Sequence, residues 1–324
     1  MELPTPLRQA VDRFLDGTPL EQLRAASERL SRRYRSETRD GRLHLDEALA
    51  VKAYLAARLP ATYAAIRASM DHLAGAAPDF APRSLVDIGA GPGSVLWAAA
   101  DCWDSLEEAT MVEASEAVRT VARALAADAG LPAAEWLAGD ATRPLPAVPA
   151  ADLVTLSYVL DELAPVAIAP LVDRLWALTS RVLLIVEPGT PAGWARVLVM
   201  RDRLIAAGAH ILAPCPHQKP CPLAAPDWCH FSRRVARSKL HRLTKNADVP
   251  WEDEKFIFLA ASRVPAPDRT ARILAPPLTA KGRIALKLCL PDGSAAEEMF
   301  SKRDGEIFKR VRRLDWGDRL PVEE

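Results

Sequence analysis

The stretch Ser84-Leu85-Val86-Asp87-Ile88-Gly89-Ala90-Gly91-Pro92-Gly93 joins a short apolar run to three closely spaced glycines. The run Ser84–Ile88 has the length and composition of a buried parallel strand. The glycines allow a tight turn and a close approach of the backbone to a ligand. A helix predicted for Ser94–Asp101 offers its first free N–H groups beside that turn. Together these segments predict the first unit of a ligand-binding α/β sheet.

Further strand and helix units follow along the chain, and their alternation predicts a doubly wound parallel sheet. The predicted strands are Ala109–Glu113, Glu135–Ala138, Leu153–Tyr158, Val182–Glu187 and Lys255–Ser262. The predicted helices between them are Ser115–Ala129, Val166–Leu178 and Gly193–Ala207.

The 324 residues are enough for two domains or for one large domain with appendages. We expect an N-terminal helical region over residues 1–80 and an α/β domain over residues 81–265 with a cysteine-rich insertion at 210–250. A small β region over residues 266–324 is expected to follow. The predicted elements outside the α/β domain are helices Leu20–Arg35, Leu45–Leu59 and Ala61–Leu73, strand Arg283–Leu290 and helix Glu306–Leu314.

The glycine loop and the ends of the next strands point to one cofactor. The pattern Asp87-x-Gly-x-Gly-x-Gly93 resembles the loop of class I S-adenosylmethionine (SAM) methyltransferases, which implies their Rossmann-like fold. Glu113 ends the second strand, where an acidic residue accepts hydrogen bonds from both ribose hydroxyls, and Asp140 follows the third, where it bonds the adenine amino group. The dinucleotide fingerprint G-x-G-x-x-G fits less well because Ser94 replaces its last glycine. The candidate SAM-binding residues are Asp87, Gly89, Gly91, Gly93, Glu113, Asp140 and Ser157.

A catalytic group is not recognisable in the same region. After the fourth strand the chain reads Ser157-Tyr158-Val159-Leu160-Asp161-Glu162-Leu163, without the Asn/Asp-Pro-Pro-Tyr motif of many base-nitrogen methyltransferases. No cysteine lies there to act as a nucleophile on cytosine C5. Asp161 or Glu162 is either a base or a helix-start acid. The sequence therefore leaves the catalytic residues unassigned and methyl transfer open.

Three cysteines cluster in a proline-rich segment, Cys215-Pro-His-Gln-Lys-Pro-Cys221-Pro-Leu-Ala-Ala-Pro-Asp-Trp-Cys229, and Cys289 lies downstream. The spacing does not match the paired C-x-x-C knuckles of structural zinc sites. Wide, irregular spacing suits a cubane iron–sulfur cluster, which needs thiolates on separate corners. Zinc, with His217 or His230 as further ligands, and three unrelated buried cysteines are the alternatives. Cys102 is expected to be a core residue.

Charge is unevenly spread although the net charge is zero. Residues 1–200 carry 19 Lys+Arg against 26 Asp+Glu, and residues 201–324 carry 23 against 16. Directly after Cys229 the sequence predicts a basic helical face suited to an RNA backbone, and the tail adds Arg310, Arg312 and Arg313. The alternative is a solvated basic surface. The candidate RNA-binding residues are Arg233, Arg234, Arg237, Lys239, Arg242 and Lys245.

These motifs in combination resemble one family. The cysteine segment with Asp-Trp-Cys229-His-Phe, then Trp251-Glu-Asp-Glu-Lys-Phe256, then Cys289 and Trp316-Gly317-Asp318, look like the methyltransferase-like assembly factors of the small ribosomal subunit, bacterial and mitochondrial. The resemblance runs from about residue 40 to the end. It implies a 4Fe–4S cluster on Cys215, Cys221, Cys229 and Cys289, SAM at the glycine loop, and attachment to small-subunit rRNA between head and body.

We therefore expect a bacterial member of that family, a ribosome-assembly factor that binds rRNA. An active rRNA methyltransferase and a zinc-containing small-molecule methyltransferase are the alternatives. The odd cysteine count, the lack of an apolar signal segment and the lack of an apolar run of spanning length lead us to expect a reducing cytoplasm. The sequence leaves the oligomeric state open, and we expect a monomer. Neither a membrane nor DNA is an expected partner.

Overall fold

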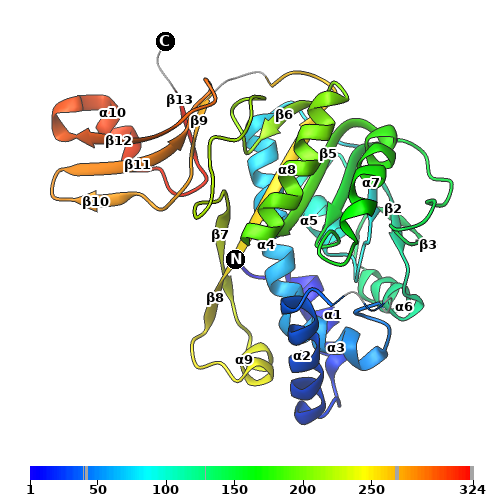
Figure 1. Ribbon diagram of the computed structural model, residues 1–324. Helices are drawn as coiled ribbons and strands as arrows, with labels where there is room; N and C mark the ends of the chain where they lie inside the picture. Colours follow the sequence, from blue (N-terminus) through cyan, green and yellow to red (C-terminus); the bar gives the residue numbers. More distant parts are fainter. Residues whose placement is uncertain (39, 41–42, 128, 267–269, 322–324) are drawn as a thin grey trace.

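The computed structural model describes residues 1–38, 40, 43–127, 129–266 and 270–321. Its body is a twisted central sheet with helices on both faces, and a second, smaller sheet lies beside it at the C-terminal end of the chain (Figure 1). None of the helices in these ranges combines the length and the apolar character that a bilayer crossing requires.

The central sheet has the strand order β3-β2-β1-β4-β5-β8-β6, and β7 pairs with the outer part of β8. β1 to β5 are parallel, whereas β8 runs antiparallel to β5. The middle strands β1, β4 and β5 are buried along most of their length and are mainly apolar, as expected where helices cover both faces. The strands are β1 Ser84–Ile88, β2 Glu108–Glu113, β3 Ala133–Ala138, β4 Ala151–Ser157, β5 Thr179–Pro188, β6 His210–Ala213, β7 Phe231–Ala236 and β8 Trp251–Ser262.

Helices connect the parallel strands and cover the sheet, and the N-terminal helices add to one side of it (Figure 1). Of the N-terminal helices, α4 is the most buried, and it packs against α5 and β7. The helices are α1 Thr5–Leu15, α2 Leu20–Arg35, α3 Ala48–Ala57, α4 Leu59–Ala76, α5 Ser94–Cys102, α6 Glu116–Ala126, α7 Pro165–Leu178, α8 Pro191–Ala206 and α9 Lys239–Lys245.

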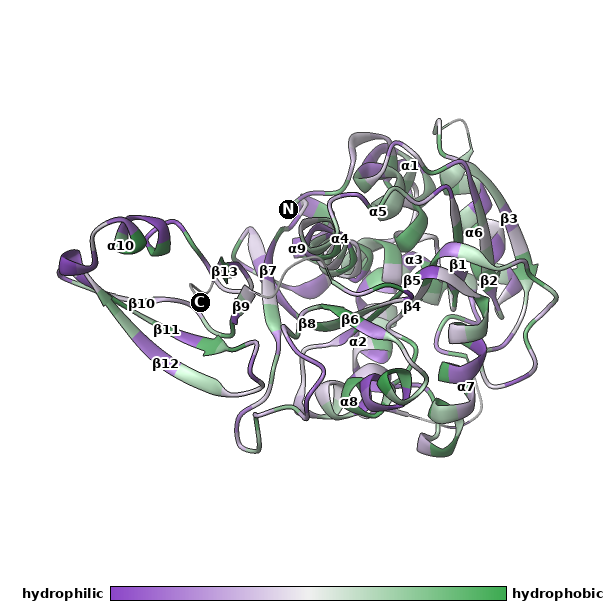
Figure 2. Cartoon of the chain, turned by 90° about the horizontal axis from the view of Figure 1, so that it is seen from above, coloured by the Kyte–Doolittle hydropathy of each residue, from purple (hydrophilic) through white to green (hydrophobic). Residues whose placement is uncertain are grey.

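The C-terminal sheet is antiparallel and has its own small core. Ile273, Leu286 and Leu288 pack there with Phe308 and Val311 of the final helix. Figure 2 shows this sheet standing away from the body, with a strongly hydrophilic outer end near α10. Its elements are β9 Thr270–Ile273, β10 Leu278–Ala280, β11 Arg283–Cys289, β12 Ala295–Ser301, the 3₁₀ helix η1 Lys302–Asp304, α10 Gly305–Val311 and β13 Arg319–Pro321.

The expected fold class is confirmed, and the local errors have physical causes. The predicted basic helix after Cys229 is wrong over its first part, because Phe231–Ala236 forms β7 along β8 instead. Phe231 and Val235 are buried at alternate positions of this strand, so tertiary pairing overrides a helix-favouring local sequence. The helix itself begins after Ser238, whose hydroxyl accepts from the His241 N–H at 3.1 Å. Residue 128, inside the predicted helix Ser115–Ala129, and residues 267–269 and 322–324 of the predicted β region lie outside the described residues.

Candidate functional site

The glycine loop forms the turn from β1 into α5, and its backbone requires glycine. Gly89, Gly91 and Gly93 have φ of +74°, +52° and +91°, in the region that side chains disfavour. A Cβ added at Gly89 would lie 2.4 Å from Val159 Cγ2, so a side chain there would also collide with the loop after β4. The loop is thus shaped for backbone contact with a ligand at the carboxyl edge of the sheet.

Asp87 lies beneath this loop at the end of β1 and is 1% exposed. Its Oδ1 accepts a hydrogen bond from Thr155 Oγ1 at 2.6 Å. Its Oδ2 has no hydrogen-bond partner among the described residues. Burial raises the pKa of Asp87 to about 8, although the Thr155 hydrogen bond acts in the opposite direction. The free Oδ2 at the ligand edge accepts a hydrogen bond when the carboxyl group is ionised and donates one when it is protonated.

Glu113 ends β2 and holds the loop from the neighbouring strand. Its Oε2 accepts from the Gly91 N–H at 3.0 Å and its Oε1 from the Ser115 N–H at 2.8 Å. Burial raises the pKa of Glu113, while these two N–H groups pull it down. The carboxylate therefore faces the ligand edge and already fixes the glycine loop.

The remaining predicted residues also lie at this edge. Asp140, after β3, accepts from the N–H and the hydroxyl of Thr142 at 2.8 and 2.7 Å. Ser157, at the end of β4, has a buried hydroxyl without a partner among the described residues. Five of the seven predicted SAM-binding residues line one cavity of about 900 Å³, which we call the cofactor cavity. They are Gly89, Gly91, Glu113, Asp140 and Ser157, with Asp87 below the loop and Gly93 at the start of α5.

The N-terminal helices supply a wall of the cofactor cavity that the sequence did not reveal. Tyr34 of α2 and His44 line it, with their ring centroids 4.9 Å apart and their planes tilted by 35°. Arg58 also lines it and forms an ion pair with Glu254 of β8 at 3.3 Å. The Tyr158 hydroxyl donates to the same carboxylate at 3.1 Å. This contact ties the wall to the loop after β4, where Tyr158 has a φ of +58°.

Buried carboxyl groups hold that loop in place. Glu187, at the end of β5, accepts from the Val159 and Leu160 N–H groups at 3.2 and 3.0 Å. Burial raises the pKa values of Glu187 and Glu162 to about 8, and Asp161 adds to the effect in both. Glu162 lines the cofactor cavity. The region therefore offers carboxyl groups that hold protons at neutral pH.

The four candidate cysteine ligands line a second cavity, which we call the thiol cavity. Three come from the segment between β6 and β7, and Cys289 comes from the end of β11 in the other sheet. Apolar side chains such as Trp194, Phe258 and Leu274 form much of its remaining wall. Cys102 is absent from that wall and ends α5. The structure therefore brings together residues up to 74 positions apart in the sequence (Cys215 and Cys289).

Burial makes the Cys229 and Cys289 thiols poor acids. It raises the pKa of Cys229 well above its ordinary value and the pKa of Cys289 to about 12, and the other cysteines add to both shifts. Among the described residues, no group of three or more His, Cys, Asp or Glu side chains lies close enough to hold a metal ion as it stands. A single ion would thus need the thiols to approach one another, because zinc binds sulfur at about 2.3 Å.

The cysteine segment is also fastened to the C-terminal sheet. His217 Nε2 lies 3.3 Å from Cys289 Sγ, and Lys219 Nζ donates to the Asp292 carbonyl at 2.7 Å. Asp227 forms an ion pair with Lys287 of β11. The thiol cavity therefore lies at the junction of the two sheets.

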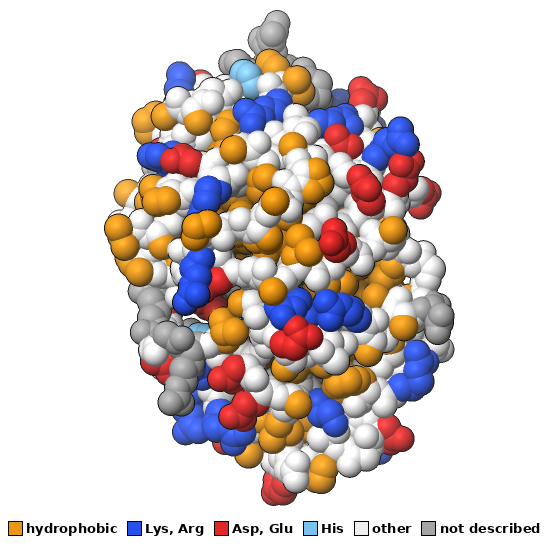
Figure 3. All heavy atoms as spheres, turned by 90° about the vertical axis from the view of Figure 1, so that its right-hand side faces the viewer, with side chains coloured by type: hydrophobic (Ala, Val, Ile, Leu, Met, Phe, Trp, Pro, Cys, Tyr) orange, Lys and Arg blue, Asp and Glu red, His pale blue; other side chains and the backbone are white. Residues whose placement is uncertain are grey.

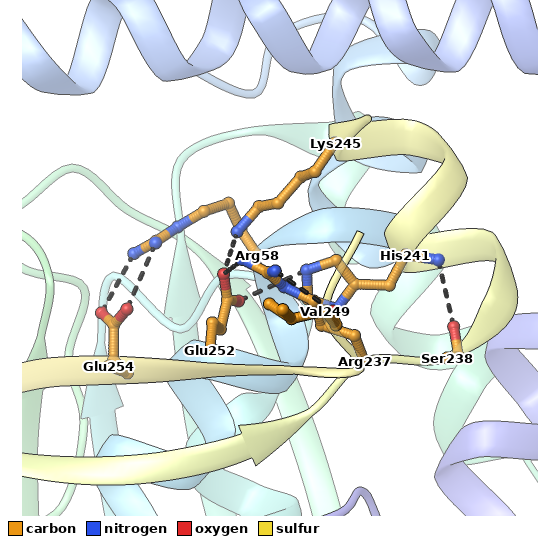
Figure 4. Close-up of polar contacts among 8 residues, drawn as sticks. All are labelled: Arg58, Arg237, Ser238, His241, Lys245, Val249, Glu252 and Glu254. Carbon is orange, nitrogen blue, oxygen red and sulfur yellow. Dashed lines mark hydrogen bonds and ion pairs between the residues drawn. The ribbon is translucent and has the colours of Figure 1, made fainter. Parts of the chain in front are cut away.

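The predicted RNA-binding residues fall into two groups. Glu252 of β8 forms ion pairs with Arg237 and Lys245 at 2.9 and 2.7 Å, and its carboxylate lies 3.3 Å from His241 Nε2 (Figure 4). Arg234 is likewise paired with Asp253 at 2.9 Å. Arg233 and Lys239 are exposed, and Arg242 is half-buried. Three of the six candidates therefore neutralise acidic residues of β8, and they lie on β7 and α9 rather than on one helical face.

The strand order, the antiparallel β8 and the glycine loop at the carboxyl edge define a class I SAM-methyltransferase-like protein, to which a thiol cavity and a C-terminal sheet have been added. The chain belongs to the family described as mitochondrial small ribosomal subunit Rsm22, whose model matches residues 48–321. This family membership confirms the resemblance at the level of the family.

Individual relatives are longer than this chain. The human mitochondrial ribosome assembly protein METTL17 is 32% identical over 288 residues, which cover 83% of this chain and 62% of that protein. The Rsm22-cox11 tandem protein 2 of Schizosaccharomyces pombe, also mitochondrial, is 24% identical over 195 residues, or 46% of this chain and 26% of that protein. The chain thus spans less than two thirds of either relative.

Among solved structures, the magnesium protoporphyrin IX methyltransferase of Synechocystis PCC 6803 with bound SAM is similar, with 13% identity and a TM-score of 0.41 over 80% of this chain and 97% of that one. The ribosomal protein L11 methylase of Lactobacillus delbrueckii has 14% identity and a TM-score of 0.37 over 60% and 76% of the two chains.

Proposed function

We propose that the chain is an assembly factor of the small ribosomal subunit that binds rRNA, SAM and a 4Fe–4S cluster. The observation that carries the proposal is the gathering of Cys215, Cys221, Cys229 and Cys289 around one cavity, on a methyltransferase-like body. The chain belongs to a family whose description names the small ribosomal subunit, which supports this subunit as the partner. A relative named as a ribosome assembly protein supports the role in assembly.

SAM fits the cofactor cavity in both shape and chemistry. The glycine loop leaves space for backbone contact, Glu113 presents a carboxylate suited to ribose hydroxyls, and Asp87 holds an open buried oxygen. A volume of about 900 Å³ is at the upper end of the range for small-molecule sites, which leaves space for an acceptor group as well.

The thiol cavity has the donor set that a 4Fe–4S cluster needs. Four thiols surround one space, three from the segment between β6 and β7 and one from the end of β11, and each would hold one corner of a cubane. The open volume is about 30 Å³, so the wall would have to move apart to admit the cluster. When bound, the cluster would supply one-electron redox chemistry and a crosslink between the two sheets. The cysteine segment and β11 hold the thiols in place, and the apolar wall excludes water. A zinc ion remains the competing ligand for the same thiols.

Binding to rRNA is best supported by the accessible cations. Arg233 on β7 and Lys239 and Arg242 on α9 remain available, and the C-terminal sheet adds an exposed basic end. In that end, the Lys302 N–H donates to the Gly282 carbonyl, which brings η1 beside the turn that carries Lys281. The exposed cations there are Lys281, Arg283, Lys302, Arg303, Lys309, Arg310, Arg312 and Arg313. By contrast, acidic and basic side chains are intermixed on the face that carries β3, α6 and α7 (Figure 3).

The rRNA contact is tested with purified small subunits. Lys239→Glu with Arg242→Glu is expected to weaken binding at least tenfold at moderate salt, because each lost phosphate contact lowers affinity and its salt dependence. Arg203→Glu, at an exposed arginine of α8 paired with Asp173, is the matched control. Unchanged affinity of the double variant would remove this surface from the contact.

Methyl transfer to rRNA is the second candidate function, favoured by the intact glycine loop and by proton-holding carboxyl groups near the cofactor cavity. Mass spectrometry of small-subunit rRNA from a deletion strain separates the two functions. We expect an assembly defect without a missing methyl group. A methyl group lost on deletion and restored by the wild-type chain would favour the enzyme.

Iron, sulfide and zinc analysis of anaerobically purified protein tests the cluster. We expect about four irons and four sulfides per chain; a colourless protein with one zinc would overturn the cluster.

We further propose a monomer in a bacterial cytoplasm, although the relatives named above are mitochondrial. We propose three domains: a helical region over residues 1–80, the methyltransferase-like domain over residues 81–265 and a β region over residues 266–324.

A further inference from the structure

Two arginines lie buried in the wall of the thiol cavity. Arg201 projects from α8 and Arg272 from β9, and the two residues are 1% and 3% exposed. They come from different layers of the molecule and reach the same group of cysteines. Guanidinium groups stay protonated in proteins, so both bring a full positive charge into this space.

The partners of these arginines are mostly uncharged. Arg201 donates to the carbonyls of His217 and Lys219 at 3.0 and 2.7 Å, between Cys215 and Cys221. The one carboxylate that it contacts, Asp202 at 3.2 Å, has a side chain that is 72% exposed to solvent. Water therefore screens most of that ion pair.

Arg272 approaches the cysteine segment from the other sheet. Its Nε donates to the Pro214 carbonyl at 3.0 Å and its Nη1 to the Gly317 carbonyl at 2.6 Å. Nη1 also lies 3.5 Å from Nδ1 of His72. None of these three partners carries a negative charge at the contacting atom, and the favourable interaction of Arg272 with Asp318 is smaller than the opposing one with Arg319.

Burying a cation without a buried anion is costly, and proteins normally supply a counter-charge. Four thiolates on an oxidised cubane core of charge plus two sum to a net charge of minus two. The two guanidinium groups sum to plus two. An anionic group on the four thiols would thus be matched in charge by the two buried arginines.

We infer that Arg201 and Arg272 are the counter-charges of the cluster and set its reduction potential. This inference rests on the proposed cluster. Positive charge near a cluster favours its more negative, reduced form, because net charge and hydrogen bonding tune such potentials. The arginines therefore raise the midpoint potential, and their bonds to the carbonyls beside Cys215 also shape the cysteine segment.

The test uses the full chain, purified and reconstituted without oxygen, with its midpoint potential measured by spectroelectrochemical titration. Arg201→Gln and Arg272→Gln remove charge and retain polarity, and each is expected to shift the midpoint to a more negative value. Arg201→Lys and Arg272→Lys retain the charge and are expected to stay close to wild type. Arg263→Gln is the control, because Arg263 also donates to two carbonyls but lies outside the thiol cavity wall.

Full clusters with wild-type potentials in both Gln variants would overturn the inference. If the Gln variants hold no cluster, the Lys variants decide: retention of iron and sulfide by Lys supports the counter-charge, and equal loss by Lys contradicts it. A wild-type chain that takes up no iron and sulfide would instead refute the proposed cluster, which is a separate result.

Discussion

Replacing Glu113 with Gln tests the cofactor cavity at its most constrained point. The carboxylate accepts from the N–H groups of Gly91 and Ser115 at 3.0 and 2.8 Å, so it fixes the loop and faces the proposed ribose position. Gln keeps the shape but turns an NH₂ group toward one of these donors. It also replaces a charged acceptor by a neutral one, and hydrogen bonds to charged groups contribute about 1.5–3 kcal/mol.

We therefore expect Glu113→Gln to weaken SAM binding by about 1.4–2.8 kcal/mol, which is roughly a 10- to 100-fold rise in Kd. Isothermal titration calorimetry with SAM and with its demethylated product measures this directly. Glu116→Gln is the matched control, because this exposed carboxylate near the start of α6 contacts Arg119, Thr120 and Arg123 of its own helix. A change of less than twofold in Glu113→Gln, with an intact fold by circular dichroism, would refute the assignment of Glu113.

Three further predictions concern stability and the thiols. Glu252→Gln should lower the free energy of unfolding by about 2–4 kcal/mol in urea melts, since it strands the buried His241 and the half-buried Arg237 and Lys245, whereas exposed Glu306→Gln should change little. Burial alone would raise the pKa of Glu252, but its hydrogen bonds to His241 and Lys245 lower it well below 4.5, so this stabilisation is present above about pH 4.5 and is lost as pH falls further. The raised pKa of Asp87 has the opposite effect: the free energy of unfolding should decrease as the pH rises from about 4 to about 8. Asp87→Asn should make this decrease shallower by up to about 1.4 kcal/mol per pH unit. Cys289→Ser should lower iron content and increase amide exchange in β9 and β11, whereas Cys102→Ser should retain full iron.

The sheet and the glycine loop were predictable because their signals are local. A short apolar run that ends in glycines determines both the strand Ser84–Ile88 and the turn after it, and the same edge then collects Glu113, Asp140 and Ser157. The wall made by Tyr34, His44 and Arg58 was not predictable. Tyr34 lies in α2, whereas His44 and Arg58 lie in the connections on either side of α3, and the packing of this region over the sheet depends on long-range contacts rather than on sequence period.

The basic segment shows why local sequence alone did not predict the whole fold. Arg233 to Lys245 has the composition of an amphipathic helix, yet the long strand β8 offers a hydrogen-bonding edge that this segment can pair with. Once β7 lies on β8, Arg234 and Arg237 face Asp253 and Glu252, and their charges are used inside the molecule. Substituting Arg237 would therefore test folding as much as RNA binding, which is why the RNA experiment uses Lys239 and Arg242.

The position of the thiol cavity connects the two proposed functions. The C-terminal sheet meets the body through contacts that converge on the cysteine segment: Cys289 beside His217, Lys287 with Asp227, and Arg272 with the Pro214 carbonyl. The exposed basic end of the molecule lies on that same sheet. A cluster bound by Cys289 and the body cysteines would lock the basic end relative to the SAM-binding sheet, and loss of the cluster would free it. Ribosome binding should thus depend on cluster occupancy even if the cluster never contacts RNA.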